Sequence, residues 1–583
     1  MGKASRWLLL LLLAILLTAL MACQNNQTIE DNNEEKVPQK IEPLHSPADE
    51  QVLRLMLKKP PQVLDSAIAT DRYSFEILNA TMSGLMRLDG SHQPQPELAE
   101  DFPQISEDGL TYTFTLRQGA TWSDGSPITA HDFVYAWKRV LSPTPAGAEQ
   151  PAPYAYLLYV IEGAKSYHEG VRGVESVGVR AINERTLEVK LERPSPFFLG
   201  MTAFATFFPQ KQEFVERNPS AYGDDADSLL YSGPFIVKEW DADQILLVRN
   251  PFYWDLHEVK LDRVRFFVLP QDNDAVNKYE AGELDVVSDI TGPYLKIYEK
   301  DPNLYQVDNL FVYYLTFNGY DEPFSNPSFR QAVHLAISRQ DYVDEVLNNG
   351  SEPATGFIPS GTLGLREDFR KENGVLIPVL GDLQGARRSL EQSLRELGYT
   401  SVGELEPIRL MVDQDDLSQK TGQFIKGALE EALGISVALE SVTFQERLSR
   451  FQSRDFDMAL SGWGADYNDP QTFLDIWTTS SPFNSAGWAN ERYDQLIDEM
   501  RRELDPEKRM QLMYDAERLL IQSVPIAPLY FQNSYGLKQP YVKGMIHHPF
   551  GAQIELKGAY IEGKEGPAQP EDSGDDGNTG TGR

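Results

Sequence analysis

The sequence predicts a large protein of the α/β or α+β class with mixed sheets. Runs rich in threonine, valine and aromatic residues, TYTFTL at 111–116 and RTLEVKL at 185–191, are typical of strands, whereas PSFRQAVHLAIS at 327–338 has the apolar spacing of a helix. At 583 residues, the chain exceeds one ordinary domain, so we expect two or more cores, or one core divided by insertions. No repeat of fixed length is visible, which disfavours propellers and solenoids.

Local signals place helices along the chain. Thr129, with Asp132 three residues later, forms the pattern of a capping box at a helix start. Asn326 before Pro327 predicts a second helix start, and Gly398 is placed to end a third helix. The apolar residues after the capping box fall on one helix face and are expected in the core: Phe133, Trp137, Val140 and Leu141.

The first 23 residues, MGKASRWLLLLLLAILLTALMAC, have the pattern of a secretory signal. Lys3 and Arg6 precede a long apolar run, which ends in small residues before Cys23. The ending LMAC resembles the bacterial lipobox, in which the cysteine is lipidated and becomes the mature N-terminus. We therefore expect residues 1–22 to be a lipoprotein signal peptide and Cys23 to carry the lipid. An ordinary signal peptide and an uncleaved anchor helix are the alternatives.

The two ends of the chain are polar and acidic. Residues 23–50 suit a disordered tether, and residues 561–583 suit a disordered tail. Cys23 is the only cysteine, which excludes an intrachain disulfide and CxxC chemistry. No second apolar run is long enough to span a bilayer. We therefore expect an extracytoplasmic protein that its N-terminal lipid anchors to the cell membrane.

Charge and motifs exclude several classes of function. A net charge of -34 repels nucleic-acid phosphates, so nucleic acid is not an expected partner. No HExxH, GxxxxGK[ST], GxSxG or GxGxxG motif is present. His547 and His548 would point opposite ways on a strand, which disfavours a shared metal. Acidic pairs such as Asp455 and Asp457 are expected by chance in so acidic a chain. We therefore expect that the protein is not an enzyme and that it binds neither a metal nor a cofactor.

The segment LSGWGADYNDPQTF, residues 460–473, places an acid among aromatic residues and glycines. Asp469 before Pro470 predicts a helix start, so Asp466 falls between a strand and a helix N-terminus that favours an ionised carboxylate. Glycines flank Trp463, and glycine in a strand often marks the close approach of a ligand or backbone. The pattern favours an extended ligand with a cationic end, such as a peptide. A turn aspartate bonded to a local arginine is the other interpretation.

The segment GWGADYNDPQTFLDIW closely resembles a motif of oligopeptide-binding proteins, the extracytoplasmic receptors of peptide ABC importers. The resemblance covers about residues 51–555, and further segments agree in order: PELAEDFPQISEDGLTYTFTLRQGATWSDGSPITAHDFVYAWKR, YSGPFIVKEW, LVRNPFYW and LTFNGYDEPFSNPSFRQAVHLAISR. It implies a monomeric receptor that captures short peptides and delivers them to an ABC transporter permease.

The resemblance also implies a two-lobed fold like that of periplasmic binding proteins, with mixed sheets, an extra subdomain and a hinge between the lobes. We expect residues 51–265 to form lobe I with the inserted subdomain. Residues 266–526 would form the second α/β lobe, and residues 527–560 would return to lobe I.

Candidate binding residues follow from the resemblance by position. Asp466 matches the aspartate that binds the amino terminus of the peptide. Some relatives carry an arginine three residues before the tryptophan, where it reaches a peptide carboxylate, but Leu460 stands here. The other residues implied are the backbone of Gly462, Trp463 and Gly464, the pocket residues Phe444, Tyr231 and Tyr154, and Asp71 and Arg72 from the facing lobe.

Other functions stay open at this point. The same fold could bind dipeptides, signalling peptides or a non-peptide solute. From a different class, a secreted hydrolase of peptides or cell-wall fragments could use acidic pairs, although the sequence lacks a nucleophile or metal motif.

Overall fold

The computed structural model describes residues 51–145, 147–148 and 150–564, except for the side chains of Phe444 and Gln445. The expected signal peptide, the lipidated Cys23, the tether and the tail from residue 565 onward lie outside the described residues. Within the described residues, no helix is both long and apolar enough to cross a membrane.

One mixed sheet joins the start of the described chain to residues 235–268. Its strand order is β1 (Val52–Leu57), β10 (Arg263–Val268), β9 (Gln244–Arg249) and β8 (Phe235–Trp240). The first pair is parallel and the others are antiparallel. Leu53 and Leu55 of β1 are buried, as the alternation of a strand with one face on a core requires.

A second, antiparallel sheet has the order β4 (Gln104–Ile105), β5 (Thr111–Thr115), β7 (Thr186–Lys190) and β6 (Val179–Asn183). It confirms the two strands predicted from threonine-rich runs. Helix α3 (Ala130–Val140) contacts β6 and β7 and begins with the predicted capping box of Thr129 and Asp132. Its aromatic stripe is core, since Phe133 and Trp137 are both fully buried.

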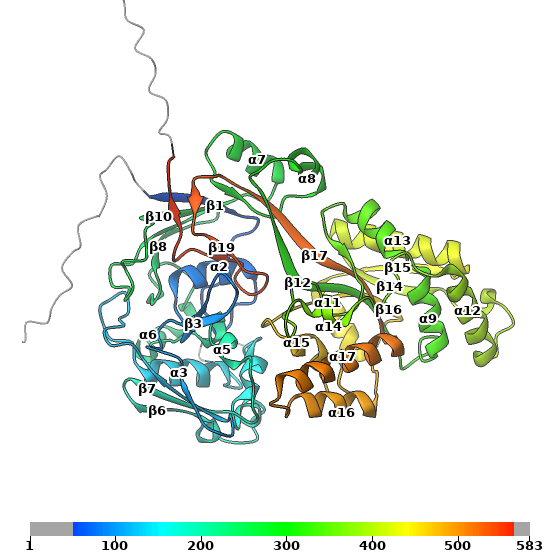
Figure 1. The fold of residues 1–583 in the computed structure, drawn as a ribbon, viewed down its shortest axis with the longest axis horizontal. Coiled ribbons are helices and arrows are strands. Elements are labelled where there is room, and N and C mark those ends of the chain that lie inside the picture. Colours follow the sequence, from blue (N-terminus) through cyan, green and yellow to red (C-terminus); the bar gives the residue numbers. More distant parts are fainter. Residues whose placement is uncertain (1–50, 146, 149, 565–583) are drawn as a thin grey trace, which may run out of the picture. The chain divides into compact units, whose positions relative to one another are not determined.

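A third sheet contains the long strands β12 (Leu304–Phe317) and β17 (Ile526–Lys538), which run antiparallel along each other (Figure 1). On the far side of β12 lies β16 (Met458–Gly464), followed by β14 (Ile408–Asp413) and β15 (Val437–Val442). The strands β11 (Val286–Val287) and β13 (Glu352–Pro353) pair with β17. Parallel and antiparallel pairs occur in the same sheet, so the predicted class with mixed sheets is confirmed.

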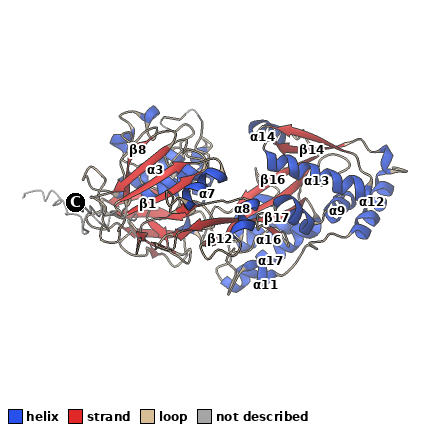
Figure 2. Ribbon diagram, turned by 90° about the horizontal axis from the view of Figure 1, so that it is seen from above, coloured by secondary structure: helices blue, strands red, loops and turns tan. Residues whose placement is uncertain are grey.

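Helices flank this third sheet (Figure 2). Helix α9 (Pro327–Ala336) begins as predicted after Asn326, whose side chain accepts a hydrogen bond from the Phe329 amide at 3.0 Å. Helix α12 (Leu383–Leu397) ends as predicted at Gly398, which has a φ of 82°. The other long helices are α13 (Asp416–Leu433), α14 (Phe444–Ser453), α16 (Glu491–Met500) and α17 (Pro506–Ser523).

Further helices and strands connect these elements. The helices are α2 (Arg72–Thr81), α4 (Ala164–His168), α5 (Phe198–Met201), α6 (Gln212–Val215), α7 (Asp272–Glu280), α8 (Gly292–Tyr298), α10 (Arg339–Asp341), α11 (Phe369–Asn373) and α15 (Gln471–Leu474). The strands are β2 (Met86–Leu88), β3 (Pro94–Pro96), β18 (Val542–Lys543), β19 (Ile546–His547), β20 (Ile554–Glu555) and β21 (Tyr560–Ile561).

The hydrophobic cores combine segments that are far apart in the sequence. One core draws on residues 53–266 and takes in the returning segment 542–559. Two further cores lie on the third sheet and use residues between 310 and 531. A buried ion pair crosses the last of these cores, where Arg370 Nη2 lies 2.9 Å from Glu517 Oε2. The amides of Phe357 and Ile358 also donate to Glu517, so this carboxylate is fully satisfied.

Candidate functional site

Asp466 lies in the turn between β16 and α15. The strand ends at Gly464, and the Asp469 side chain accepts a hydrogen bond from the Gln471 amide at 2.9 Å, which fixes the helix start one residue after the predicted Pro470. The nearby Arg509 guanidinium binds both oxygens of Asp469, at 2.7 and 2.9 Å. The local arginine therefore neutralises Asp469 and leaves Asp466 to other partners.

Neutral groups surround the Asp466 carboxylate. The Tyr156 hydroxyl donates to its Oδ1 at 2.9 Å, and the Thr472 hydroxyl approaches Oδ2 at 3.5 Å. In the part of the chain that the structure describes, no lysine or arginine forms an ion pair with Asp466. Burial raises the pKa of Asp466 to about 7, against the opposing effect of the Tyr156 and Thr472 hydrogen bonds. A ligand cation would stabilise the ionised form, so this carboxylate can act as an ammonium anchor.

Strand β16 leads to Asp466 and has one incomplete edge. It pairs with β12 along its whole length, from Phe317 with Met458 to Phe311 with Gly464. On its other edge, the pairing with β14 covers only Met458 and Ala459. The backbone between Gly462 and Gly464 therefore has no strand on that edge in the described chain.

The two glycines of this segment have a packing role as well. A Cβ atom added to Gly462 would lie 2.5 Å from the Phe311 ring, and one added to Gly464 would lie 2.8 Å from it. Trp463 between them is half-buried, and its ring centroid lies 5.1 Å from that of Phe483. The close neighbour that these glycines accommodate is therefore an aromatic ring of the adjacent strand.

The three aromatic pocket candidates have different positions. The half-buried Tyr154 packs against Phe75 and Phe204, with ring centroids 5.6 and 5.5 Å away. Burial and then the nearby Asp466 raise its pKa to about 12, which places Tyr154 beside the anchor. Tyr231 is buried, and its hydroxyl donates to the Ala226 carbonyl at 2.6 Å, so its side chain stabilises the loop that precedes it. Phe444 is the first residue of α14, and its side chain lies outside the described part of the structure.

Asp71 and Arg72 also take different roles. Asp71 caps α2, since its carboxylate accepts from the Ser74 amide at 2.9 Å and from the Ser74 hydroxyl at 2.6 Å. Arg72 reaches away from this cap, pairs with Asp289 and donates to the Gln553 side chain at 3.1 Å. Asp71 is therefore a helix cap, whereas Arg72 lines a cavity.

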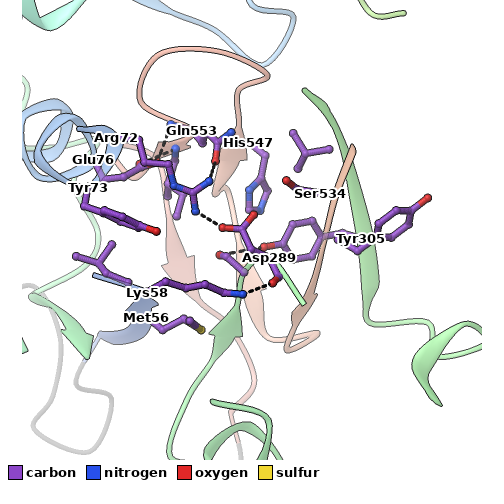
Figure 3. Close-up of a pocket in the computed structure, with 15 residues that line it drawn as sticks. Met56, Lys58, Arg72, Tyr73, Glu76, Asp289, Tyr305, Ser534, His547 and Gln553 are labelled. Carbon is purple, nitrogen blue, oxygen red and sulfur yellow. Dashed lines mark hydrogen bonds and ion pairs between the residues drawn. The ribbon is translucent and has the colours of Figure 1, made fainter. Parts of the chain in front are cut away.

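That cavity is lined mainly by polar and charged side chains, and Figure 3 shows the Arg72 guanidinium directed at the Asp289 carboxylate, with which it pairs. Lys58 donates to the backbone carbonyl of Asp289 at 2.6 Å. Glu76 accepts from the Gln553 and Ile554 amides at 2.8 and 2.9 Å, and burial raises its pKa to about 7. The two hydrogen bonds of Glu76 tie α2 to the hairpin of β19 and β20.

A second cavity lies directly beside Asp466, and no sequence motif pointed to it. It measures about 470 Å³, including its mouth, which opens to solvent. Its walls come from α2, from the region around α5 and from the hairpin of β19 and β20, so no local pattern could have revealed it. Besides Asp466, its lining includes Phe75, Asn79, Gly200, Phe204, Phe208, His548, Ala552 and Glu555.

Two further sequence observations have structural outcomes. Leu460 is buried in the core of the third sheet, but the guanidinium of Arg447 donates to its carbonyl at 3.1 Å. An arginine from α14 thus lies beside the position where some relatives carry one on the strand. Asp455 and Asp457 both bind the Arg409 guanidinium, at 2.7 and 2.9 Å, so this acidic pair forms an ion-pair cluster.

Comparisons with known proteins agree with this arrangement. The chain is 34% identical over 544 residues to a dipeptide-binding protein, DppE, of Bacillus subtilis, a match that spans 93% of this chain and 96% of the relative. A structure described as Listeria monocytogenes OppA bound to peptide is 33% identical, has a TM-score of 0.74 and covers 88% of this chain and 99% of its own.

The substrate-binding domain of an oligopeptide ABC transporter from Bacillus anthracis is also similar, at 31% identity and a TM-score of 0.74, with 88% of this chain and 99% of that one covered. These likenesses confirm the predicted two-lobed binding-protein fold. Residues 93–485 match the family described as bacterial extracellular solute-binding proteins, family 5 Middle. With a match over more than half of its length, the chain belongs to this family of solute-binding receptors.

Proposed function

We propose that this protein is an extracytoplasmic receptor that binds short oligopeptides and delivers them to an ABC importer. The observation that carries the proposal is the Asp466 carboxylate, which is partly buried, held by the neutral Tyr156 and Thr472 hydroxyls, and placed in the lining of a cavity. Such a carboxylate binds best to a ligand that brings its own positive charge, as a peptide amino terminus does.

The open edge of β16 supports a peptide as the ligand. Residues Gly462–Gly464 have no strand partner on that edge in the described chain, so an extended peptide can pair its main chain there while its ammonium reaches Asp466. Tyr154, beside the anchor, and Arg72, in the charged cavity, would line the path of the peptide. Tyr231, Asp71 and Phe444 are less direct candidates.

Relatives named for dipeptide and oligopeptide binding support the same ligand class, and the relative named as a transporter's substrate-binding domain supports the importer. We also propose a monomer without catalytic activity that a signal peptide, residues 1–22, directs across the membrane. A lipid on Cys23 would then hold it at the outer surface. The lobe boundaries near residues 265 and 527 belong to the same proposal.

Tryptophan fluorescence tests the function directly. The purified domain, freed of bound ligand by unfolding and refolding, is titrated with a pool of tripeptides to pentapeptides and with the same pool N-acetylated. The proposal requires binding of the free peptides and at least about tenfold weaker binding of the acetylated ones, because acetylation removes the ammonium charge. Binding of neither pool by a protein that is folded by circular dichroism would overturn it.

Dipeptides are the second candidate ligand, because DppE is named for dipeptide binding. A titration with dipeptides alone separates the two. Tighter binding of dipeptides than of tripeptides with the same first two residues would favour a dipeptide receptor with the same ammonium anchor.

A further inference from the structure

Apolar side chains form much of the lining of the cavity beside Asp466. Phe75 from α2 and Phe204 pack with ring centroids 5.0 Å apart, and Phe208 and Ala552 complete the apolar surface around them. Gly200 of α5 faces open space, since a Cβ atom added there meets nothing within 4 Å. An apolar group that enters this cavity would exchange water for close contacts with aromatic rings.

The polar groups of the same cavity already have partners. Glu555 accepts from the Arg87 guanidinium at 2.6 Å, and Asn79 donates to the Ile554 carbonyl at 3.2 Å. His548 lies 3.0 Å from His92, nitrogen to nitrogen, and burial lowers its pKa to about 4, so its ring is neutral. The lining residues therefore offer no free cation to an acidic group of a guest, and burying such a group there without a partner would be costly.

The position of Asp466 in this wall determines what the guest is. In a peptide, the ammonium and the side chain of the first residue are bonded to the same carbon atom. If the ammonium binds Asp466, the first side chain must therefore lie within a few bonds of the carboxylate, and Asp466 is itself part of the cavity lining. The hairpin of β19 and β20 separates this space from the charged cavity of Figure 3, because Ala552 lines one and Gln553 the other.

We propose that this cavity receives the side chain of the first peptide residue and selects apolar side chains over acidic ones. The inference rests on the proposed function, because it needs the ammonium of the peptide at Asp466. It assigns this selectivity to the aromatic walls formed by Phe75, Phe204 and Phe208.

Tripeptides that differ only in the first residue test the selectivity. Leu-Ala-Ala, Gly-Ala-Ala and Asp-Ala-Ala are titrated calorimetrically into the unmodified, ligand-free protein. The leucine peptide should bind at least about tenfold more tightly than the glycine peptide, and the aspartate peptide should be the weakest. If all three bind within about threefold of one another, the selectivity is refuted while the proposed function stands. If none binds, the proposed function itself fails.

A variant that fills the cavity tests whether this cavity causes the selectivity. Gly200→Leu should weaken binding of Leu-Ala-Ala by at least about tenfold and leave Gly-Ala-Ala within about threefold. The matched control is Gly427→Leu on α13, another helical glycine where an added Cβ meets nothing within 4 Å. Equal loss for both peptides, or no loss for either, would overturn the assignment to this cavity. The peptide series tests the selectivity even if Gly200→Leu fails to fold.

Discussion

Replacing Asp466 by asparagine removes the charge of the proposed anchor and preserves its shape. The amide oxygen of asparagine can still accept the hydrogen bond that Tyr156 donates at 2.9 Å, so the turn should keep its geometry. A pair of opposite charges 4 Å apart is worth about 4 kcal/mol at an effective dielectric constant of about 20. Loss of one partner of a buried pair costs about 2–5 kcal/mol, so we expect Kd to rise about 30-fold or more.

The ligand-free variant should not lose stability. Burial raises the pKa of Asp466 in the folded protein to about 7, above its value in the unfolded chain. The ionised carboxylate therefore costs stability at high pH, and this cost disappears as the pH falls below the unfolded pKa. Asp466→Asn should thus have an equal or higher Tm than the parent at pH 8, and the difference should shrink towards pH 4.

Binding should depend on pH in the same way. Affinity of the parent should fall below about pH 7, as Asp466 becomes protonated, and above about pH 8, as the peptide amine loses its proton. The variant should lack the acid limb of this profile. Calorimetry with one tripeptide from pH 5 to 9 measures both proteins. An unchanged Kd in the folded variant at pH 7.5 would refute the role of Asp466.

Three further predictions concern other parts of the chain. Tyr156→Phe should shift the acid limb of the binding profile to higher pH, because it removes a hydrogen bond that favours the ionised anchor; calorimetry measures this, and an unmoved limb contradicts it. Cys23→Ser should move the protein from washed membranes into the soluble fraction, and retention in the membranes would argue against a lipid anchor. Arg370→Met should lower the free energy of unfolding in urea by about 3–5 kcal/mol, because it leaves the buried Glu517 without its cation. Its control, Arg366→Met in an exposed pair, should change this by less than about 1 kcal/mol; equal losses would contradict the argument.

Features that depend on neighbouring residues could be predicted without the structure. The fold class, the strands at residues 111–115 and 186–190 and the capping box at Thr129 follow from local periodicity and capping chemistry, and the structure confirms them. The turn that carries Asp466 was also readable, because a strand, two glycines and an Asp-Pro step lie within one short segment. Resemblance to a family added the two-lobed fold, which no local signal contains.

The partners of these residues, in contrast, depend on how distant segments pack together. Tyr156 and Asp466 are 310 positions apart, and Arg72 and Asp289 are 217 apart, so no spacing in the sequence pairs them. The sequence also does not show that Arg509 pairs with Asp469 and leaves Asp466 with neutral hydrogen-bond donors. The cavity beside Asp466 forms only where α2, the region around α5 and the hairpin of β19 and β20 meet the turn that carries Asp466. Helices and turns follow from the conformational preferences and capping groups of neighbouring residues. The solvent exposure and pKa of a side chain depend instead on all the groups that pack around it.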